Sequence, residues 1–387
     1  MRSEQAAMAY INQTLDTTDK LTILSQDSQY DLACACSMTN EDRRHRAKDD
    51  TWVYPVALPD RRGKTFLFKT LLSNVCSNDC KYCPLRANQD PQRCTLEPEE
   101  LAKTFMEYYR ANRVEGFFLS SGVIGDPDKT MERINKTAAI LRFREGFRGY
   151  MHLKIIPGAS DAAIEESLSL AHNVSLNIEA PGEKNFKKLS SRKNYLDDVI
   201  RPIKLISELT APGARYSKVR QTTQFVVGAA DETDQDIVKY SWGLYKRLDV
   251  ERIYFSAYQR GLGAADLPGE QAKQSNAELL MREHRLYQVD WLIRQYGFQQ
   301  DDIGFERNGN LSLTEDPKAI WARTHPEFFP INANKAGRHD LLRVPGLGPA
   351  TVNRILSQRR RSPLRGVSDI AKPGKLLRKA ETYLRFS

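Results

Sequence analysis

The sequence predicts an α/β protein that combines a partial (β/α)6 barrel with a small, all-α C-terminal module. Between residues 65 and 296, short apolar runs rich in β-branched and aromatic residues alternate with longer amphipathic stretches. This alternation is typical of βαβ units whose strands form a parallel sheet. The separate module is indicated by charge, because residues 338–387 carry a net +9, as much as the whole chain.

Six runs have the length and composition of strands: residues 66–72, 116–120, 150–156, 174–179, 222–228 and 252–258. The stretches between them favour helices, for example residues 97–113 and 161–172. A full TIM barrel has eight such units, so six favour a partial, TIM-like barrel over the alternative of a doubly wound sheet. In either fold, ligands bind at the carboxyl ends of the strands.

These patterns divide the chain into four segments. Residues 1–60 are expected to form an N-terminal extension, 61–300 the barrel, 301–335 a linking segment and 336–387 the helical module. We find no internal repeat or low-complexity tract in the sequence.

Composition excludes several classes of protein. No apolar run approaches the ~20 residues of a membrane-spanning helix, and the first residues lack the basic start and apolar stretch of a secretory signal. We therefore expect a soluble, cytoplasmic protein with no membrane partner. Six cysteines in 387 residues are too few for a disulfide framework, so clustered cysteines indicate metal binding or chemistry.

Three of these cysteines follow the first predicted strand in a C-x3-C-x2-C pattern: Cys76, Cys80 and Cys83. Three thiolates in one loop suit a [4Fe–4S] cluster with one iron left open for a substrate or cofactor. A structural zinc site is the main alternative, although it needs four ligands and no histidine lies near the triplet. Three unconnected thiols are a further alternative that this spacing disfavours.

The motif C-x3-C-x-aromatic-C, with Tyr82 before the last cysteine and six βα units around it, resembles the radical S-adenosylmethionine (radical SAM) superfamily. The resemblance implies a partial (β/α)6 barrel with a [4Fe–4S] cluster on the three cysteines. It also implies that S-adenosylmethionine chelates the open iron. One-electron reduction would then cleave its sulfonium to methionine and a 5′-deoxyadenosyl radical, which takes a hydrogen atom from the substrate. An electron donor such as flavodoxin or ferredoxin would supply the electron.

The resemblance also implies residues that bind S-adenosylmethionine. The superfamily has a Gly-Gly-Glu-like turn after the second strand, where this chain departs from the pattern with Ser120-Ser121-Gly122 and Val123. Glu179 matches a polar position that meets the ribose or the methionine moiety, with a strand-end ion pair as the alternative. Arg192 and Lys193 are candidates to neutralise the methionine carboxylate, and Ser256 and Tyr258 to line the adenine pocket. The alternatives for these residues are a solvated basic pair and packing at the barrel mouth.

The remaining cysteines, Cys34, Cys36 and Cys94, leave three interpretations open. They are structural thiols, hydrogen-atom donors during turnover, or ligands of a second cluster. The donor interpretation draws on the position of Cys34 before the barrel, where an N-terminal extension could cover the barrel mouth.

The C-terminal segment has twelve basic and three acidic residues in 338–387, a typical footprint of a polyanionic partner. Within it, apolar residues end one helix, Pro-Gly-Leu-Gly forms a tight turn and Pro349 starts the next helix. This arrangement resembles a helix-hairpin-helix motif, which implies phosphate binding by backbone N–H groups without reading of base sequence. Candidate DNA-binding residues are Gly346, Leu347, Gly348, Thr351, Arg354, Arg359 and Arg360. A protein–protein contact is the alternative.

Together with residues 20–31 and 316–330, these features resemble the DNA modification/repair proteins of the radical SAM superfamily. The resemblance implies a radical enzyme that modifies or repairs a base or sugar in DNA. A target base must be unpaired or extruded, and Tyr195 and Tyr216 are candidates to stack on it. The alternatives are an RNA-modifying radical SAM enzyme, an iron–sulfur redox-sensing DNA-binding protein without catalysis, and a zinc-binding structural protein.

Overall fold

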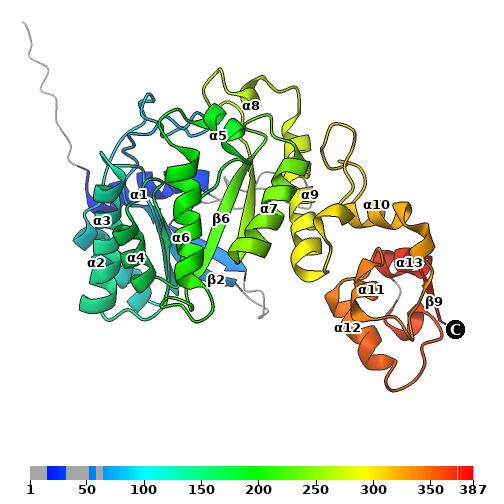
Figure 1. The fold of residues 1–387 in the computed structure, drawn as a ribbon. Helices are drawn as coiled ribbons and strands as arrows, with labels where there is room; N and C mark the ends of the chain where they lie inside the picture. Colours follow the sequence, from blue (N-terminus) through cyan, green and yellow to red (C-terminus); the bar gives the residue numbers. More distant parts are fainter. Residues whose placement is uncertain (1–14, 32–51, 58–63, 373, 387) are drawn as a thin grey trace, which may run out of the picture. The chain divides into compact units, whose positions relative to one another are not determined.

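The computed structural model describes residues 15–31, 52–57, 64–372 and 374–386. The chain forms two compact units. The first consists of the described residues in 1–31, 45–79 and 85–175, and the second of those in 80–84 and 176–387. The α-helices and some of the strands are labelled in Figure 1.

The first unit contains an antiparallel strand, a run of parallel strands and the helices between them. Its strands are β1 (Val53–Ala57), β2 (Lys64–Leu71), β3 (Gly116–Ser120), β4 (Tyr150–Lys154) and β5 (Asn173–Ser175). Its helices are α1 (Thr17–Asp27), α2 (Pro98–Arg110), α3 (Pro127–Ala139) and α4 (Asp161–Leu170), with short helical segments η1 (Ser28–Asp31) and η2 (Ile140–Arg144). Strand β1 pairs antiparallel with β2, and β2 to β5 are parallel.

The helices of the first unit begin where the sequence provides caps. Glu97 and Glu100 form a capping box at α2, and the side chains of Asp126 and Ser160 accept backbone N–H groups at the starts of α3 and α4. The buried ring of Phe105 on α2 lies 4.8 Å from that of Phe117 on β3, measured between ring centroids. Aromatic burial of this kind stabilises the packing of α2 on the sheet.

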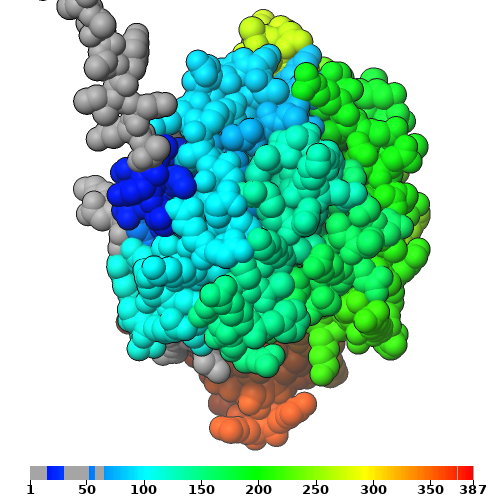
Figure 2. Space-filling view, turned by 90° about the vertical axis from the view of Figure 1, so that its left-hand side faces the viewer, coloured from blue at the N-terminus to red at the C-terminus, as the bar shows by residue number. Residues whose placement is uncertain are grey.

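Helix α1 packs against the first unit through polar contacts with the start of α2. The Thr17 hydroxyl donates to Glu100 at 2.5 Å, and the Lys20 ammonium lies 3.2 Å from the same carboxylate. Figure 2 shows α1, in blue, against the cyan surface of this unit. The N-terminal region therefore contributes a helix that belongs to the first unit.

The second unit contains two further strands of the sheet and the C-terminal region. Its first part holds α5 (Glu183–Leu189), η3 (Tyr195–Ile200), α6 (Arg201–Thr210), β6 (Arg220–Val227), α7 (Asp234–Leu248), β7 (Arg252–Ala257), α8 (Pro268–Gln271), α9 (Asn276–Gln295) and η4 (Gln300–Asp302). Its last part holds α10 (Pro317–Thr324), η5 (Pro326–Phe328), β8 (Ile331–Asn332), α11 (Arg338–Arg343), α12 (Pro349–Gln358), η6 (Val367–Asp369), α13 (Lys375–Glu381) and β9 (Leu384–Arg385).

Strands β1 to β7 form one sheet in sequence order within the described part of the chain. The α/β half-barrel predicted from the sequence is confirmed, with six parallel strands where six were expected. Two details differ: an antiparallel strand, β1, is added at one edge, and β5 ends at Ser175 rather than at Glu179. No helix in the described ranges is long and apolar enough to cross a membrane.

The C-terminal region contains a cluster of buried apolar residues. Leu341, Leu342, Val352 and Ile355 are fully buried in it, and they come from α11 and α12. The expectation of an all-α module needs one correction, because β8 and β9 pair in parallel at its edge. Arg343 joins this cluster to the preceding segment through two 3.1 Å bonds to the Asp302 carboxylate.

Candidate active site

Cys76 lies in the first unit, in a loop after β2 that packs closely against the turn after β3. The Gly122 N–H donates to the Ser73 carbonyl at 2.7 Å, and the Ser77 N–H donates to the Val123 carbonyl at 2.9 Å. A Cβ atom at Gly122 would lie only 2.4 Å from the Val75 carbonyl oxygen. Glycine is therefore required at 122 because of space, and the turn that the sequence singled out contacts the loop that carries Cys76.

Two serines lie at the end of β3 and the start of this turn. Ser120 is buried, and its carbonyl accepts the Leu72 N–H at 2.8 Å. The Ser121 hydroxyl donates to the Gly122 carbonyl at 2.7 Å. The turn thus offers backbone and hydroxyl groups where the superfamily pattern has glycine and an acid.

Arg93 and Asn74 hold the base of the cysteine loop, and the sequence analysis did not single them out. The Arg93 guanidinium donates to the Leu85 carbonyl at 2.9 Å and to the Asn74 carbonyl. It therefore ties together the two ends of residues 75–84. The buried Asn74 amide donates at 2.7 Å to the Asp27 carboxylate and accepts the Cys94 N–H at 2.8 Å. Only their place beside the triplet could have drawn attention to these polar residues.

Cys80 and Cys83 lie in the second unit, where the Cys83 N–H donates to the Cys80 carbonyl at 2.9 Å. Between them, the Tyr82 hydroxyl donates to the Glu179 carboxylate at 2.7 Å. Burial raises the pKa of Tyr82 well above its ordinary value, and the charges of Glu179, Cys80 and Cys83 add to this. Tyr82 and Glu179, which were proposed separately as cofactor contacts, are therefore hydrogen-bonded to each other.

The segment around Tyr82 is anchored to the second unit on both sides. The Lys81 N–H donates to the Leu189 carbonyl at 2.7 Å, and the Lys81 carbonyl accepts the Ala264 N–H at 2.8 Å. The Tyr82 ring packs on an apolar cluster that includes Leu189 and Tyr258. These contacts fix the position of the aromatic residue that precedes the third thiol.

The other candidate cofactor residues occupy different environments. Ser256 is buried in β7, and Tyr258 is buried with its hydroxyl bonded to Glu270. Glu179 is buried in a left-handed conformation, with φ of 63°. Arg192 lies at an exposed bend between α5 and η3.

Neither tyrosine proposed for base stacking is placed for that role. Tyr195 is 4% exposed, and its hydroxyl accepts the Gly182 N–H at 3.2 Å. Tyr216 precedes β6 and so lies at the amino end of that strand, whereas ligands of parallel barrels bind at the carboxyl ends. We correct both assignments.

Cys94 is buried in the first unit, and its thiol donates to the Lys20 carbonyl at 3.8 Å. Burial raises the pKa of this thiol to about 11, so it stays protonated near neutral pH. These contacts with α1 give Cys94 a structural role, while the hydrogen-donor hypothesis stays a prediction. Cys34 and Cys36 lie outside the described residues.

The donor set suits an iron–sulfur cluster. Cys76, Cys80 and Cys83 lie within eight residues of one loop, and the four described cysteines form no disulfide. In the described parts of the chain, no three His, Cys, Asp or Glu side chains are arranged around a single metal ion. A [4Fe–4S] cluster does not require such an arrangement, because each cysteine binds a different iron.

In the segment predicted to be a helix-hairpin-helix, helices α11 and α12 are joined by a short turn, and the motif itself stays a prediction. Gly346 has φ of 88°, and Gly348 is the N-cap of α12. Thr351 is half-buried and Arg354 and Arg360 are exposed on or just after α12. Leu347 is buried, and its N–H donates to the Val344 carbonyl at 3.1 Å. This hydrogen bond lies within the turn and stabilises it.

Arg359 differs from its exposed neighbours in sequence. Its guanidinium donates to the Ala333 and Ala336 carbonyls at 3.1 and 2.7 Å. We therefore remove Arg359 from the residues expected to contact phosphate, because it connects α12 to the segment that precedes α11.

Comparison with known families agrees with this site. Residues 70–240 of the chain match the family model of the radical SAM superfamily. Its members are enzymes that use a [4Fe–4S] cluster and S-adenosylmethionine, and they typically need an electron donor. No curated protein matches the chain.

Three solved structures show similarity at low sequence identity. HydG, a maturase of the [FeFe]-hydrogenase, is 13% identical with a TM-score of 0.42, over 56% of this chain and 48% of that one. HydG from Carboxydothermus hydrogenoformans is 16% identical with a TM-score of 0.44, over 57% and 50%. Methylornithine synthase (PylB) is 15% identical with a TM-score of 0.44, over 72% and 74%. The chain thus spans about half the length of the HydG structures.

Proposed function

We propose that this radical SAM enzyme acts on DNA and modifies or repairs a base or sugar there. The observation that carries the proposal is the distribution of exposed charge. Of the twelve basic residues in 338–387, ten are exposed, and Arg343 and Arg359 are the two that are half-buried. Such a surface favours a polyanionic partner, since neutralised phosphates release counterions.

The turn between α11 and α12 supports the same partner. Helix α12 (Pro349–Gln358) has ten residues, and its N-cap Gly348 has no side chain to cap it. Pro349 has no N–H, so the N–H groups that follow it and the positive end of the helix dipole are the groups suited to a phosphate oxygen. Arg354 and Arg360 lie exposed along or just after the same helix. Contacts of this kind bind DNA without selecting a sequence.

Cys80, Cys83 and the Tyr82–Glu179 pair belong to the same compact unit as this basic surface. With its cofactors bound, such a site supplies a 5′-deoxyadenosyl radical that takes a hydrogen atom from the substrate. The chain's own residues hold and shield that chemistry. Tyr82 fixes the position of the buried Glu179 carboxylate, and the apolar cluster around Tyr82 excludes water.

The proposal is tested with two variants that separate chemistry from binding. Cys76→Ala removes one cluster ligand and should abolish 5′-deoxyadenosine formation by the anaerobically reconstituted protein with dithionite, while DNA affinity stays unchanged. A variant with both Arg360→Ser and Arg361→Ser should bind duplex DNA more weakly and show a smaller dependence of affinity on salt, because phosphate contacts are lost.

Competition between duplex DNA and transfer RNA separates the proposed substrate from RNA. Preference for transfer RNA would replace DNA with RNA in the proposal. Retention of 5′-deoxyadenosine formation by Cys76→Ala would contradict the assignment of the cluster ligands. Equal DNA affinity of the double arginine variant and the unchanged protein would contradict the proposed binding surface.

A further inference from the structure

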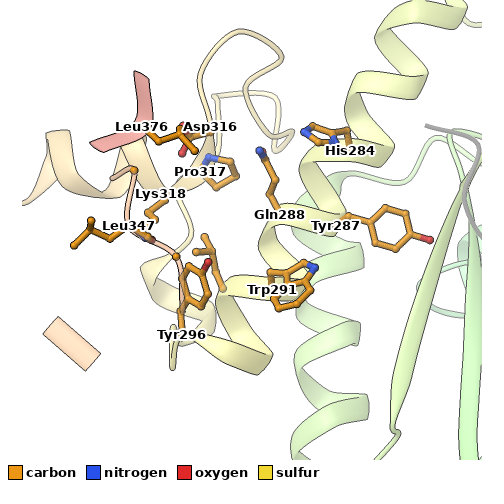
Figure 3. A pocket seen from close by; sticks show the side chains of 13 residues that line it. His284, Tyr287, Gln288, Trp291, Tyr296, Asp316, Pro317, Lys318, Leu347 and Leu376 are labelled. Atoms are coloured by element: carbon orange, nitrogen blue, oxygen red, sulfur yellow. The ribbon is translucent and has the colours of Figure 1, made fainter. Parts of the chain in front are cut away.

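A cavity of 420 Å³ lies between α9 and the turn that precedes α12. Its volume falls in the range of small-molecule pockets, about 300–1,000 Å³. One wall is helix α9, which contributes Gln288 and Trp291, and the opposite wall is the backbone of Gly346 to Gly348, with Lys318 from the start of α10 (Figure 3). All of these residues belong to the second compact unit.

The α9 wall offers an aromatic face and a polar group. Trp291 is 45% exposed although it lines the cavity, and the Arg294 guanidinium lies over its ring, 5.7 Å from the centroid. Figure 3 shows Gln288 and Trp291 projecting from α9 toward the side where Lys318 and Leu347 lie. Tyr287 points the other way, because its hydroxyl donates to the Phe255 carbonyl at 3.0 Å. The Arg294 guanidinium thus contacts the Trp291 indole, and the exposed part of this indole is accessible to a ligand.

The opposite wall is held rigidly. The buried Lys318 ammonium donates to the Leu347 carbonyl at 2.6 Å and lies over the Tyr296 ring, 4.7 Å from its centroid. At Gly346, φ is 88°, and a Cβ atom there would lie 2.2 Å from the Leu376 carbonyl oxygen. The cavity wall and the proposed phosphate-binding turn are therefore the same backbone, and its close packing leaves no space for a side chain at residue 346.

This shared backbone determines what the cavity can receive. A phosphate bound at the α12 N-terminus would lie next to the N-cap Gly348, which also lines the cavity. An indole face binds a nucleobase by stacking without choosing its identity, and the Gln288 amide can hydrogen-bond to a base edge. Asp316, the acid in the lining, is engaged with Lys379 at 3.1 Å and caps α10, so it does not present a free negative charge to the strand.

We propose that this cavity receives one unpaired nucleobase of the nucleic acid held by the α11–α12 turn, stacked on Trp291. The inference rests on the proposed function, and it adds a preference for DNA with an extruded or unmatched nucleotide. Such a pocket gives the enzyme a means to find an irregular site while its phosphate contacts stay independent of sequence.

The test compares fluorescence anisotropy titrations of the full chain with three labelled DNA probes. They are a fully paired duplex, the same duplex with one bulged adenine, and the same bulge with an abasic residue. We expect the bulged adenine to bind about 10-fold more tightly than the paired duplex, as expected for one stacked base. The abasic bulge should lose this advantage, which separates base binding from bending of the duplex.

Trp291→Ala should remove the preference for the bulged adenine and leave affinity for the paired duplex unchanged, whereas Trp291→Phe should retain part of it. Phe143→Ala is the matched control, since Phe143 is 79% exposed and lies in the first unit. Retention of the preference in Trp291→Ala, or equal binding of the adenine and abasic bulges, would overturn the inference alone. Failure of the unchanged protein to bind any DNA probe would overturn it together with the proposed DNA partner.

Discussion

Gly122 shows how one residue can position a cofactor loop. Its hydrogen bond to Ser73 and the 2.4 Å approach of a Cβ atom to Val75 leave no space for a side chain. A Cβ atom added at residue 122 would also lie 3.2 Å from the Cβ atom of Cys76. Backbone atoms cannot move away as a flexible side chain can, so any larger residue must displace the loop that carries the first thiol.

Gly122→Ala should therefore lower the iron and sulfide content of the anaerobically reconstituted protein. Gly243→Ala, in the middle of α7 with no atom within 4 Å of the added Cβ, is the matched control and should leave both contents unchanged. Equal iron content in the two variants would show that the turn after β3 does not position the cluster loop.

Lys318 should make stability depend on pH. Burial lowers its pKa from 10.5 to about 7. Between these values the unfolded chain binds a proton that the folded chain does not, so stability should increase as pH rises from about 7 toward 10. Lys318→Met should lose this increase, and Lys246→Met, on the exposed surface of α7, should keep it. Denaturant unfolding at both ends of the range measures the difference, and parallel pH profiles for the Lys318→Met and unchanged proteins would contradict the shift.

Some of the individual site residues could be predicted from the sequence, and others could not. The thiols of Cys76, Cys80 and Cys83 are predictable because their spacing is itself the signal. Arg93 and Trp291 are not, since a lone arginine or tryptophan has no pattern until the fold brings carbonyls or a cavity to it.

Among the elements, strands with a strong apolar pattern are predictable, and two strands are exceptions. Residues 116–120 form β3 with the expected bounds. Strand β1 was missed because it is short and contains Pro55, a residue tolerated only at a sheet edge, where β1 lies. The fifth strand is shorter than expected, since β5 ends at Ser175 and pairing resumes only as an isolated parallel bridge between Glu179 and Phe225.

Helix α9 is held to the loop after β6 by a buried ion cluster. The Arg282 guanidinium donates to the Asp234 carboxylate and to the Glu232 carbonyl, each at 2.6 Å. Burial raises the pKa of the Glu232 and Asp234 carboxyl groups. The Glu232 carboxylate also accepts the Ala230 N–H at 3.0 Å, in the apolar cluster on which Tyr82 packs. The cluster therefore links α9 to the surroundings of the candidate site.

Arg282→Met should destabilise the protein by about 3–5 kcal/mol, because two buried carboxylates lose their positive partner. Arg220→Met provides the comparison, since Arg220 and Glu251 form an exposed ion pair worth about 0–1 kcal/mol. Urea unfolding monitored by circular dichroism measures both. A cost below 1 kcal/mol for Arg282→Met would mean that this cluster does not hold α9 in place.

For the whole molecule, charge and chemistry are both predictable from sequence, but their spatial relation is not. The basic segment and the cysteine motif are more than 250 residues apart in the sequence. In the fold, ten exposed basic residues share a compact unit with Cys80, Cys83 and Glu179. A sequence pattern carries no information about such a long-range association, which arises only from packing.

The proposed function is that of a radical SAM enzyme that acts on DNA. Its most direct test is 5′-deoxyadenosine formation by the anaerobically reconstituted protein with dithionite and S-adenosylmethionine, in the presence and absence of duplex DNA containing one bulged nucleotide. We expect the product to increase when this DNA is added and Arg360→Ser with Arg361→Ser to reduce the increase. Equal product with and without DNA, from protein with a full iron and sulfide content, would contradict DNA as the substrate.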